Sequence, residues 1–127
     1  MEKRIIYHRR NLHRIPELGF EEHKTSAYLW QHLHKLKTFS LQRSAKTGII
    51  AYRPGNGATL AFRSDMDALP IIEETAVEWK SGHPGKMHAC GHDGHMAILL
   101  TFAEWLDQQT NLPSIILLFQ PAEEGIG

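Results

Sequence analysis

Residues 87 to 95 of this 127-residue chain read MHACGHDGH and bring together side chains that bind transition metals. Cys90 is the single cysteine of the chain, and His92 follows it after one glycine. Because Gly91 has no side chain, the backbone can fold so that a thiolate and an imidazole face one point. The pattern indicates a metal site. A small buried cysteine beside an unrelated loop histidine is the alternative interpretation.

Two adjacent glutamates, Glu123 and Glu124, follow the most apolar run of the chain, IILLF at 115–119. Neighbouring side chains need not point the same way, so one carboxylate could bind a metal while the other accepts a proton from water. A solvated acidic loop is the alternative, because charged pairs lie mostly at the surface. Their position directly after a buried strand favours the metal interpretation.

Asp65 and Asp67 are spaced so that, in an extended segment, both point to the same face. They could bind a metal or orient one of its ligands, and an ordinary loop before Pro70 is the alternative. His83 and His88 lie among glycines and prolines, and we expect both to be exposed, with a place in an active-site loop as the alternative. Four further histidines lie on predicted helices and have no acidic or thiol partner at motif spacing. We interpret them as structural: His8, His23, His32 and His34.

Helical periodicity predicts three helices. The first covers about 3–14 and is stopped by Pro16, and the second covers about 21–36, with leucines at helical spacing and two glutamates in its first turn. The third covers about 94–108, with Asp93 or a neighbour as its cap. Its apolar stripe is expected to lie in the core and consists of Met96, Leu99, Phe102, Ala103 and Leu106.

Two short strands are predicted at 48–53 and 59–63, joined as a hairpin by the sequence PGNG. A third strand at 114–120 reads as buried on both faces. Because helices and strands alternate along the chain, the predicted fold class is α/β. In such sheets, sites collect at the carboxyl ends of strands, so the three polar clusters could converge there.

Charge and composition exclude several classes of partner. Lys and Arg number 14 and Asp and Glu also number 14, so no net field attracts nucleic acid or an anionic membrane. No apolar run reaches the length of a membrane span or of a signal peptide. A single cysteine cannot form an internal disulfide, which favours a reducing compartment. We therefore expect a cytoplasmic protein that binds neither nucleic acid nor membrane.

Four motifs in order make the chain resemble a known family. They are LHRIPELGFEE (12–22), RSDMDALPI (63–71), MHACGHDGHMAILL (87–100) and FQPAEEG (119–125). This set resembles the amino-terminal part of the metal-dependent amidohydrolases that include hippurate hydrolase, N-acyl-amino-acid amidohydrolases and plant auxin-conjugate hydrolases. The motifs span most of the chain, so the resemblance is specific.

The resemblance implies the mixed-sheet, helix-covered catalytic domain of a dinuclear metallohydrolase, with two divalent metal ions, Zn or Mn. It implies that Cys90, His92 and Glu124 are metal ligands. It also implies two catalytic residues, Glu123 as the general base and Asp67 as the residue that orients a ligand. Two further residues receive no ligand role from it: Asp65, which stands where related peptidases carry a histidine, and His95.

The implied reaction is hydrolysis of the amide of a small N-acyl or N-aroyl amino acid or dipeptide-like substrate. The family completes its site with later histidines and a lid domain, so we expect residues 1–127 to be the incomplete amino-terminal part of the catalytic domain, inactive alone. The first alternative is a non-catalytic remnant that binds metal weakly or self-associates as a homo-oligomer. The second makes Cys90 a catalytic nucleophile.

Overall fold

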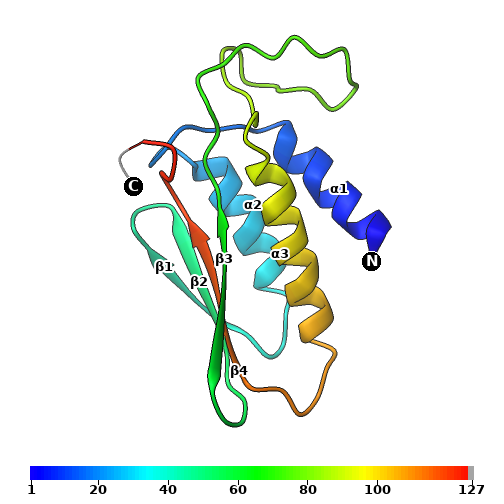
Figure 1. Ribbon diagram of the computed structural model, residues 1–127, viewed down its shortest axis with the longest axis vertical. Helices are drawn as coiled ribbons and strands as arrows, with labels where there is room; N and C mark the ends of the chain where they lie inside the picture. Colours follow the sequence, from blue (N-terminus) through cyan, green and yellow to red (C-terminus); the bar gives the residue numbers. More distant parts are fainter. Residues whose placement is uncertain (126–127) are drawn as a thin grey trace.

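A computed structural model describes residues 1–125 of the chain, with three helices and four strands (Figure 1). In chain order these elements are α1 (Glu2–His13), α2 (His23–Leu33), β1 (Ser40–Ser44), β2 (Gly48–Arg53), β3 (Thr59–Asp65), α3 (His92–Leu106) and β4 (Ser114–Gln120). A long loop, 66–91, separates β3 from α3 and arches over one end of the molecule. None of the described helices has the length and apolarity needed to cross a membrane.

The strands form one mixed sheet in the order β1-β2-β4-β3. The pairs β1–β2 and β2–β4 are antiparallel, whereas β3 and β4 are parallel neighbours. Parallel neighbours need a crossover connection, and α3 supplies it. As a result, β3 and β4 finish at the same edge of the sheet, and α3 begins beside them (Figure 1).

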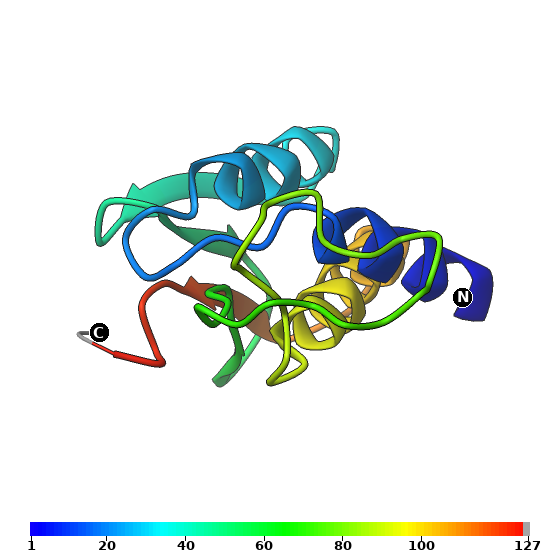
Figure 2. The same ribbon diagram turned by 90° about the horizontal axis from the view of Figure 1, so that it is seen from above.

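All three helices lie on one side of the sheet (Figure 2). Helix α2 packs on β2 and α3 packs on β3 and β4, while α1 packs against α3. The core between these layers is built from alternate residues of β2 and β4, from the apolar faces of the helices and from the loop after β3. Its largest members are Phe119, Leu12, Leu29, Leu33, Ile49, Met66, Met96, Leu100 and Leu117. The α/β class and the three helices predicted from the sequence are confirmed.

The predicted hairpin between the second and third strands is wrong. Strands β2 and β3 both exist, but β4 lies between them. The loop that follows β2 bonds to the start of β4 instead, because Gly55 N donates to Ser114 Oγ at 3.0 Å and Asn56 N donates to Leu112 O at 3.0 Å. The most apolar strand thus takes the central position, where it buries the most surface.

The hairpin that does form joins β1 to β2, and the sequence did not predict β1. This strand is polar and mostly exposed, with the sequence SLQRS. Its connection places two non-glycine residues, Ala45 and Lys46, at positive φ of 48° and 65°. Neither residue type signals such a turn, so nothing local marked the segment as a hairpin.

Two details of the other predicted elements are also corrected. Strand β4 has the predicted bounds but is buried only on its helix-facing side, since Ile116 and Leu118 on the other side are partly exposed. Helix α3 is capped by Gly91, at φ +88°, rather than by Asp93, whose side chain bonds elsewhere. Glycine adopts this left-handed conformation without steric cost, which suits the sharp entry into the helix.

Candidate metal centre

Three polar segments meet where β3 and β4 end and α3 begins. Asp65 is the last residue of β3, and His92 is the first residue of α3. Glu123 and Glu124 follow shortly after Gln120, the last residue of β4. The polar clusters that are distant in sequence therefore lie together at one edge of the sheet, the carboxyl edge of its parallel pair.

His92 is held in an orientation that suits a metal ligand. The residue is 5% exposed, and Nδ1 lies 2.8 Å from the backbone oxygen of Asp67, to which Nδ1–H can donate a hydrogen bond. That hydrogen bond leaves the lone pair on Nε2, which lies 3.5 Å from Glu124 Oε1 and 3.7 Å from Glu123 Oε2. Metal-binding histidines generally use such a bond to fix their tautomer and ring orientation.

One compact group of possible ligands consists of Asp65, His92 and Glu123, whose ligand atoms all lie within 4.8 Å of one another. This group differs from the set implied by the resemblance, Cys90, His92 and Glu124, and it includes Asp65, to which no role was assigned. His92 is common to both sets. The cluster is therefore large enough to offer donors to more than one cation.

Cys90 is exposed and lies among acidic side chains. A hydrogen bond to Glu124 is the main cause that raises the pKa of the Cys90 thiol, and the nearby carboxylates of Glu123 and Asp67 act in the same direction. An uncompensated thiolate is disfavoured here, which argues against Cys90 as a free nucleophile. A bound cation would reverse this balance.

Asp67 connects the two sides of the cluster. It is 2% exposed, its Oδ2 accepts a hydrogen bond from the backbone N–H of Glu124 at 2.8 Å, and its carbonyl accepts from His92. Its Oδ1 is buried and accepts no hydrogen bond from the residues that the structure describes, and His92 Nδ1 lies 3.3 Å from it. An unsatisfied buried carboxylate oxygen amid further carboxylates is the environment that a divalent cation neutralises.

Glu22 is a support that the sequence analysis missed. It is fully buried, and its carboxylate accepts hydrogen bonds from Ala122 N at 2.9 Å, Phe20 N at 3.0 Å and the Thr47 hydroxyl. Ala122 has a positive φ of 54°, a strained conformation for alanine that this bond helps to hold. Glu22 thereby fixes the backbone that leads into Glu123 and was wrongly interpreted as a charge in a helical first turn.

A second support lies beneath the start of α3. His13, 3% exposed, places Nδ1 2.7 Å from Asp93 Oδ2 and Nε2 3.0 Å from Glu73 Oε1. The hydrogen bond to Asp93 is the main cause that raises the pKa of His13. This bridge ties α1 to α3 and to the 66–91 loop. In the sequence, the only sign that His13 has a role at the site is its position in the LHRIPELGFEE motif.

The expectation that His83 and His88 are exposed is wrong. His83 is partly buried and its Nδ1 lies 2.8 Å from the carbonyl oxygen of Pro16. His88 is 4% exposed, and neither ring nitrogen has a partner among the described residues. Burial lowers the pKa of His88 to about 4, so the ring is neutral near pH 7.

A small hollow of about 190 Å³ opens beside Asp67 and Glu124. Its wall also includes Leu18, Gly19 and Leu69, so it joins a polar side to an apolar one. This is the combination that small-molecule sites generally show, a few converging polar groups within an apolar wall. The hollow gives a ligand direct access to the acidic cluster.

The model of peptidase family M20/M25/M40 matches residues 61–127, a range that contains the potential metal ligands Asp65, Cys90, His92, Glu123 and Glu124. The chain belongs to this family. Among named members, it is 46% identical to N-acetyldiaminopimelate deacetylase from Streptococcus suis, over 96% of this chain and 34% of that protein. It is 45% identical to the enzyme of the same name from Listeria monocytogenes, over 100% of this chain and 35% of that protein.

Solved structures of the M20 family share this fold. A Bacillus subtilis protein described as a dinuclear metal-binding peptidase superposes with a TM-score of 0.89 at 39% identity, covering 96% of this chain and 35% of that one. A Staphylococcus aureus tripeptidase superposes with a TM-score of 0.72 at 14% identity, covering 98% and 37%, which shows a shared fold alone. The chain spans about a third of the length of the M20 relatives it matches.

Proposed function

We propose that the protein carrying this chain hydrolyses the amide bond of an N-acyl amino acid with the help of two divalent metal ions. The observation that carries this proposal is the group Asp65, His92 and Glu123, with ligand atoms within 4.8 Å of one another, beside Cys90 and Glu124. The chain spans a third of its relatives, so we assign the complete reaction to the whole protein and treat residues 1–127 as part of its catalytic domain.

The side chains of the candidate metal centre could bind two metal ions that prefer different ligand atoms. Cys90, His92 and Glu124 offer a thiolate, an imidazole and a carboxylate, a combination that suits Zn²⁺. The carboxylate-rich side with Asp65 could prefer Mn²⁺. When bound, the cations would polarise the substrate carbonyl and make water more acidic. Asp67 acts through His92, because its carbonyl fixes the ring and directs Nε2 toward the glutamates.

Glu123 is the general base in this proposal. Its side chain is 39% exposed, so a water molecule and a substrate can reach the carboxylate, and Oε2 lies 3.7 Å from His92 Nε2. From this position Glu123 accepts a proton from the attacking water and delivers it to the nitrogen of the departing amine. The reaction then yields a carboxylic acid and a free amino acid.

The names of the relatives favour a specific acyl group. Deacetylases of N-acetyldiaminopimelate are 45–47% identical to this chain, so we infer that the acyl group is acetyl and the amine is an amino acid of that kind. The hollow of about 190 Å³ beside Glu124 suits a small acyl group. We place the reaction in the cytoplasm, because the single cysteine is suited to a reducing compartment.

The test uses the whole protein that carries this segment, stripped of metal and reloaded with Zn²⁺ or Mn²⁺. We expect metal-dependent release of acetate from N-acetyldiaminopimelate, and slower turnover of hippurate. Glu123→Gln should lower kcat by about 100-fold or more when the two proteins are compared at equal metal content. Glu21→Gln, an exposed neighbour of Glu22, serves as the control. Turnover without metal, or an unchanged kcat in Glu123→Gln, would contradict the proposal.

A further inference from the structure

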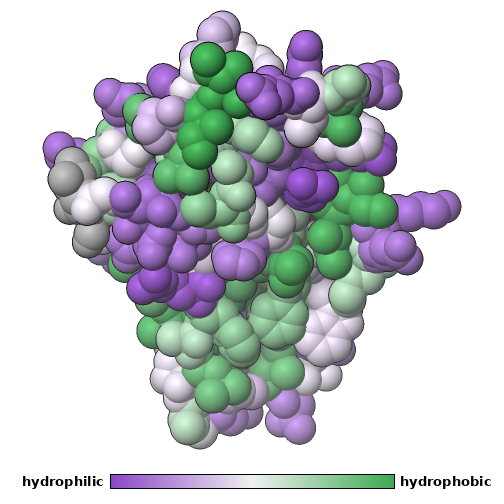
Figure 3. All heavy atoms as spheres, turned by 45° about the horizontal axis from the view of Figure 1, so that its top comes forward, coloured by the Kyte–Doolittle hydropathy of each residue, from purple (hydrophilic) through white to green (hydrophobic). Residues whose placement is uncertain are grey.

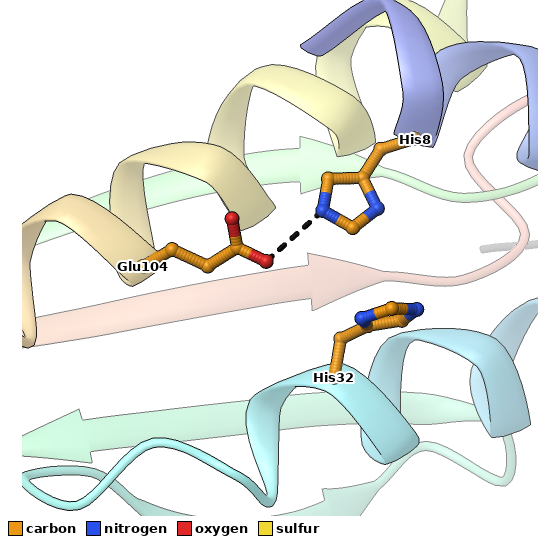
Figure 4. A group of neighbouring side chains, drawn as sticks. All are labelled: His8, His32 and Glu104. Atoms are coloured by element: carbon orange, nitrogen blue, oxygen red, sulfur yellow. Dashed lines mark hydrogen bonds and ion pairs between the residues drawn. The ribbon is translucent and has the colours of Figure 1, made fainter. Parts of the chain in front are cut away.

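Three helices meet at a second group of potential metal ligands, His8 on α1, His32 on α2 and Glu104 on α3 (Figure 4). Their ligand atoms all lie within 4.8 Å of one another. Glu104 follows His92 by twelve positions on α3, and a helix rises 1.5 Å per residue, so the two sites are separated by roughly 18 Å. This group is therefore distinct from the candidate metal centre.

His8 is already held as a metal-bound histidine would be. The residue is fully buried, Nδ1 lies 2.8 Å from the hydroxyl of Tyr28, and Nε2 lies 3.0 Å from Glu104 Oε1. A tyrosine hydroxyl can donate or accept. Without a cation, Nε2–H can donate a hydrogen bond to Glu104. In the other tautomer Nδ1–H donates to the Tyr28 hydroxyl, the Nε2 lone pair faces the carboxylate, and a cation between the two would bind both. The 3.0 Å separation is close to the roughly 3.3 Å between two ligands of a tetrahedral zinc ion.

His32 completes the group from the other side. Neither of its ring nitrogens has a hydrogen-bond partner among residues 1–125. Its ring lies 4.8 Å from that of His8, between centroids, and 4.6 Å from that of Tyr28. Because His32 is only partly buried, a modest side-chain rotation can bring a ring nitrogen to the point that His8 and Glu104 face.

The protonation states of the three groups suit a cation. Burial is the main cause that lowers the pKa of both His8 and His32, so each ring has a free lone pair near pH 7. Burial alone would raise the pKa of Glu104, but hydrogen bonds from Arg4 and His8 outweigh it and lower that pKa. The site thus offers two neutral imidazoles and a carboxylate.

Arg4 carries a positive charge that opposes the binding of a metal ion at this group. Its Nε and Nη2 lie 2.9 Å and 2.8 Å from the two oxygens of Glu104, and its side chain is 47% exposed. Metal-binding carboxylates are commonly hydrogen-bonded from outside in this way, so Arg4 can stay in place. Lys35 also lowers the pKa of His32 by its charge. The positive charges of Arg4 and Lys35 repel an incoming metal ion. We therefore expect the metal to bind more weakly here than at a structural zinc site.

We propose that His8, His32 and Glu104 form a second site for a divalent transition metal of the Zn²⁺, Ni²⁺ and Co²⁺ class, which ties the three helices together. Two histidines and one carboxylate are a known donor set for such ions and leave a coordination position open for water. Solvent can reach it, because His32 and Glu104 are partly exposed. A bound ion would stabilise the folded chain, since the ligands come together only on folding.

The first experiment uses the 127-residue chain with Cys90→Ser and His92→Ala, so that the candidate metal centre is silenced. We expect calorimetric titration with Ni²⁺ to give one ion per chain. Because Ni²⁺ is paramagnetic, it should broaden the backbone amide signals around His8, His32 and Glu104 in ¹H–¹⁵N spectra. Absence of Ni²⁺ binding, or broadening confined to the ends of β3 and β4, would overturn the proposal.

Matched histidine variants give the second measurement. His32→Ala should weaken Ni²⁺ binding by at least about tenfold, whereas His34→Ala, which removes an exposed histidine from the end of the same helix, should leave it unchanged. Equal affinities in the two variants would refute the site. If the silenced chain does not fold, as judged by circular dichroism, the same comparison is made in the unmodified chain by the broadening at α1, α2 and α3.

Discussion

A neutral histidine next to the candidate metal centre makes the chain sensitive to acid. His88 is buried without a hydrogen-bond partner in the described structure, and desolvation lowers its pKa to about 4. An unfolded histidine has a pKa of about 6.5, so the folded chain binds a proton at this residue less readily than the unfolded chain does. The resulting stability is fully present above pH 6.5 and is lost as the pH falls toward 4.

Replacement of His88 by glutamine removes this titration. Between pH 7.5 and 5, we expect the unfolding free energy of the unmodified chain to fall by about 2 kcal/mol more than that of His88→Gln. Urea denaturation at several pH values measures the difference, and His34→Gln, at an exposed position, should behave like the unmodified chain. Parallel losses in His88→Gln and the unmodified chain would show that His88 is not the residue responsible.

Single residues of the candidate site were predictable only where the sequence itself clusters them. Cys90 and His92 stand two positions apart, and Glu123 and Glu124 are adjacent, so their chemistry is visible in the chain. Glu22 reaches Ala122 across 100 positions, and its role depends on a contact that no local pattern encodes. Glu22 was therefore missed, whereas the proposed ligands and base stand in clusters that the sequence shows directly.

At the scale of elements, the β1–β2 turn stores avoidable strain. Ala45 adopts a φ of +48°, which costs an alanine roughly 1 kcal/mol and a glycine almost nothing. Ala45→Gly should therefore raise the unfolding free energy by about 0.5–1 kcal/mol. Ala27→Gly, at an exposed position within α2, should lower it by a similar amount because glycine is a poor helix former. Thermal unfolding of the two variants gives the comparison, and a loss of stability in Ala45→Gly would contradict this view.

Elements with a strong intrinsic pattern were predicted well. The apolar stripe of α3, apart from the partly buried Phe102, and the helix-facing residues of β4 follow from burial, which acts on the residues of one segment. The pairing of strands was not predicted, because it depends on which strand gains most from the centre of the sheet. The Pro54–Gly57 segment has the residues of a tight turn, yet it passes beside the start of β4.

At the scale of the whole molecule, the sheet has an open edge with an apolar groove beside it. Strand β3 forms that edge, and the groove between β3 and α3 has a volume of about 340 Å³. Its wall includes Phe62, 37% exposed, and Ile98, 55% exposed. Figure 3 shows hydrophobic side chains gathered over this part of the surface. Unpaired strand edges next to apolar surface favour association between chains.

We expect the 127-residue chain to self-associate through this groove. Ile98→Lys places a charge in the groove on an exposed helical position and should shift the chain toward the monomer by at least about tenfold in dissociation constant. Ile6→Lys, at an exposed position on α1 outside the groove, is the control. Sedimentation velocity over a range of concentrations tests both. A chain that stays monomeric throughout, or an equal effect of Ile6→Lys, would show that the groove is not the contact.

The hydrogen bonds of Glu22 also affect when, during folding, the candidate metal centre can form. It joins Phe20 and Thr47 to Ala122, so the backbone before Glu123 reaches its conformation only when the end of β4 returns to the first third of the chain. Contacts between such distant residues form late, because long loops must close first. During synthesis, a chain that has not yet reached residue 122 contains Asp65, Cys90 and His92 but still lacks Glu123 and Glu124. We therefore expect the candidate metal centre to be completed only after β4 has joined the sheet.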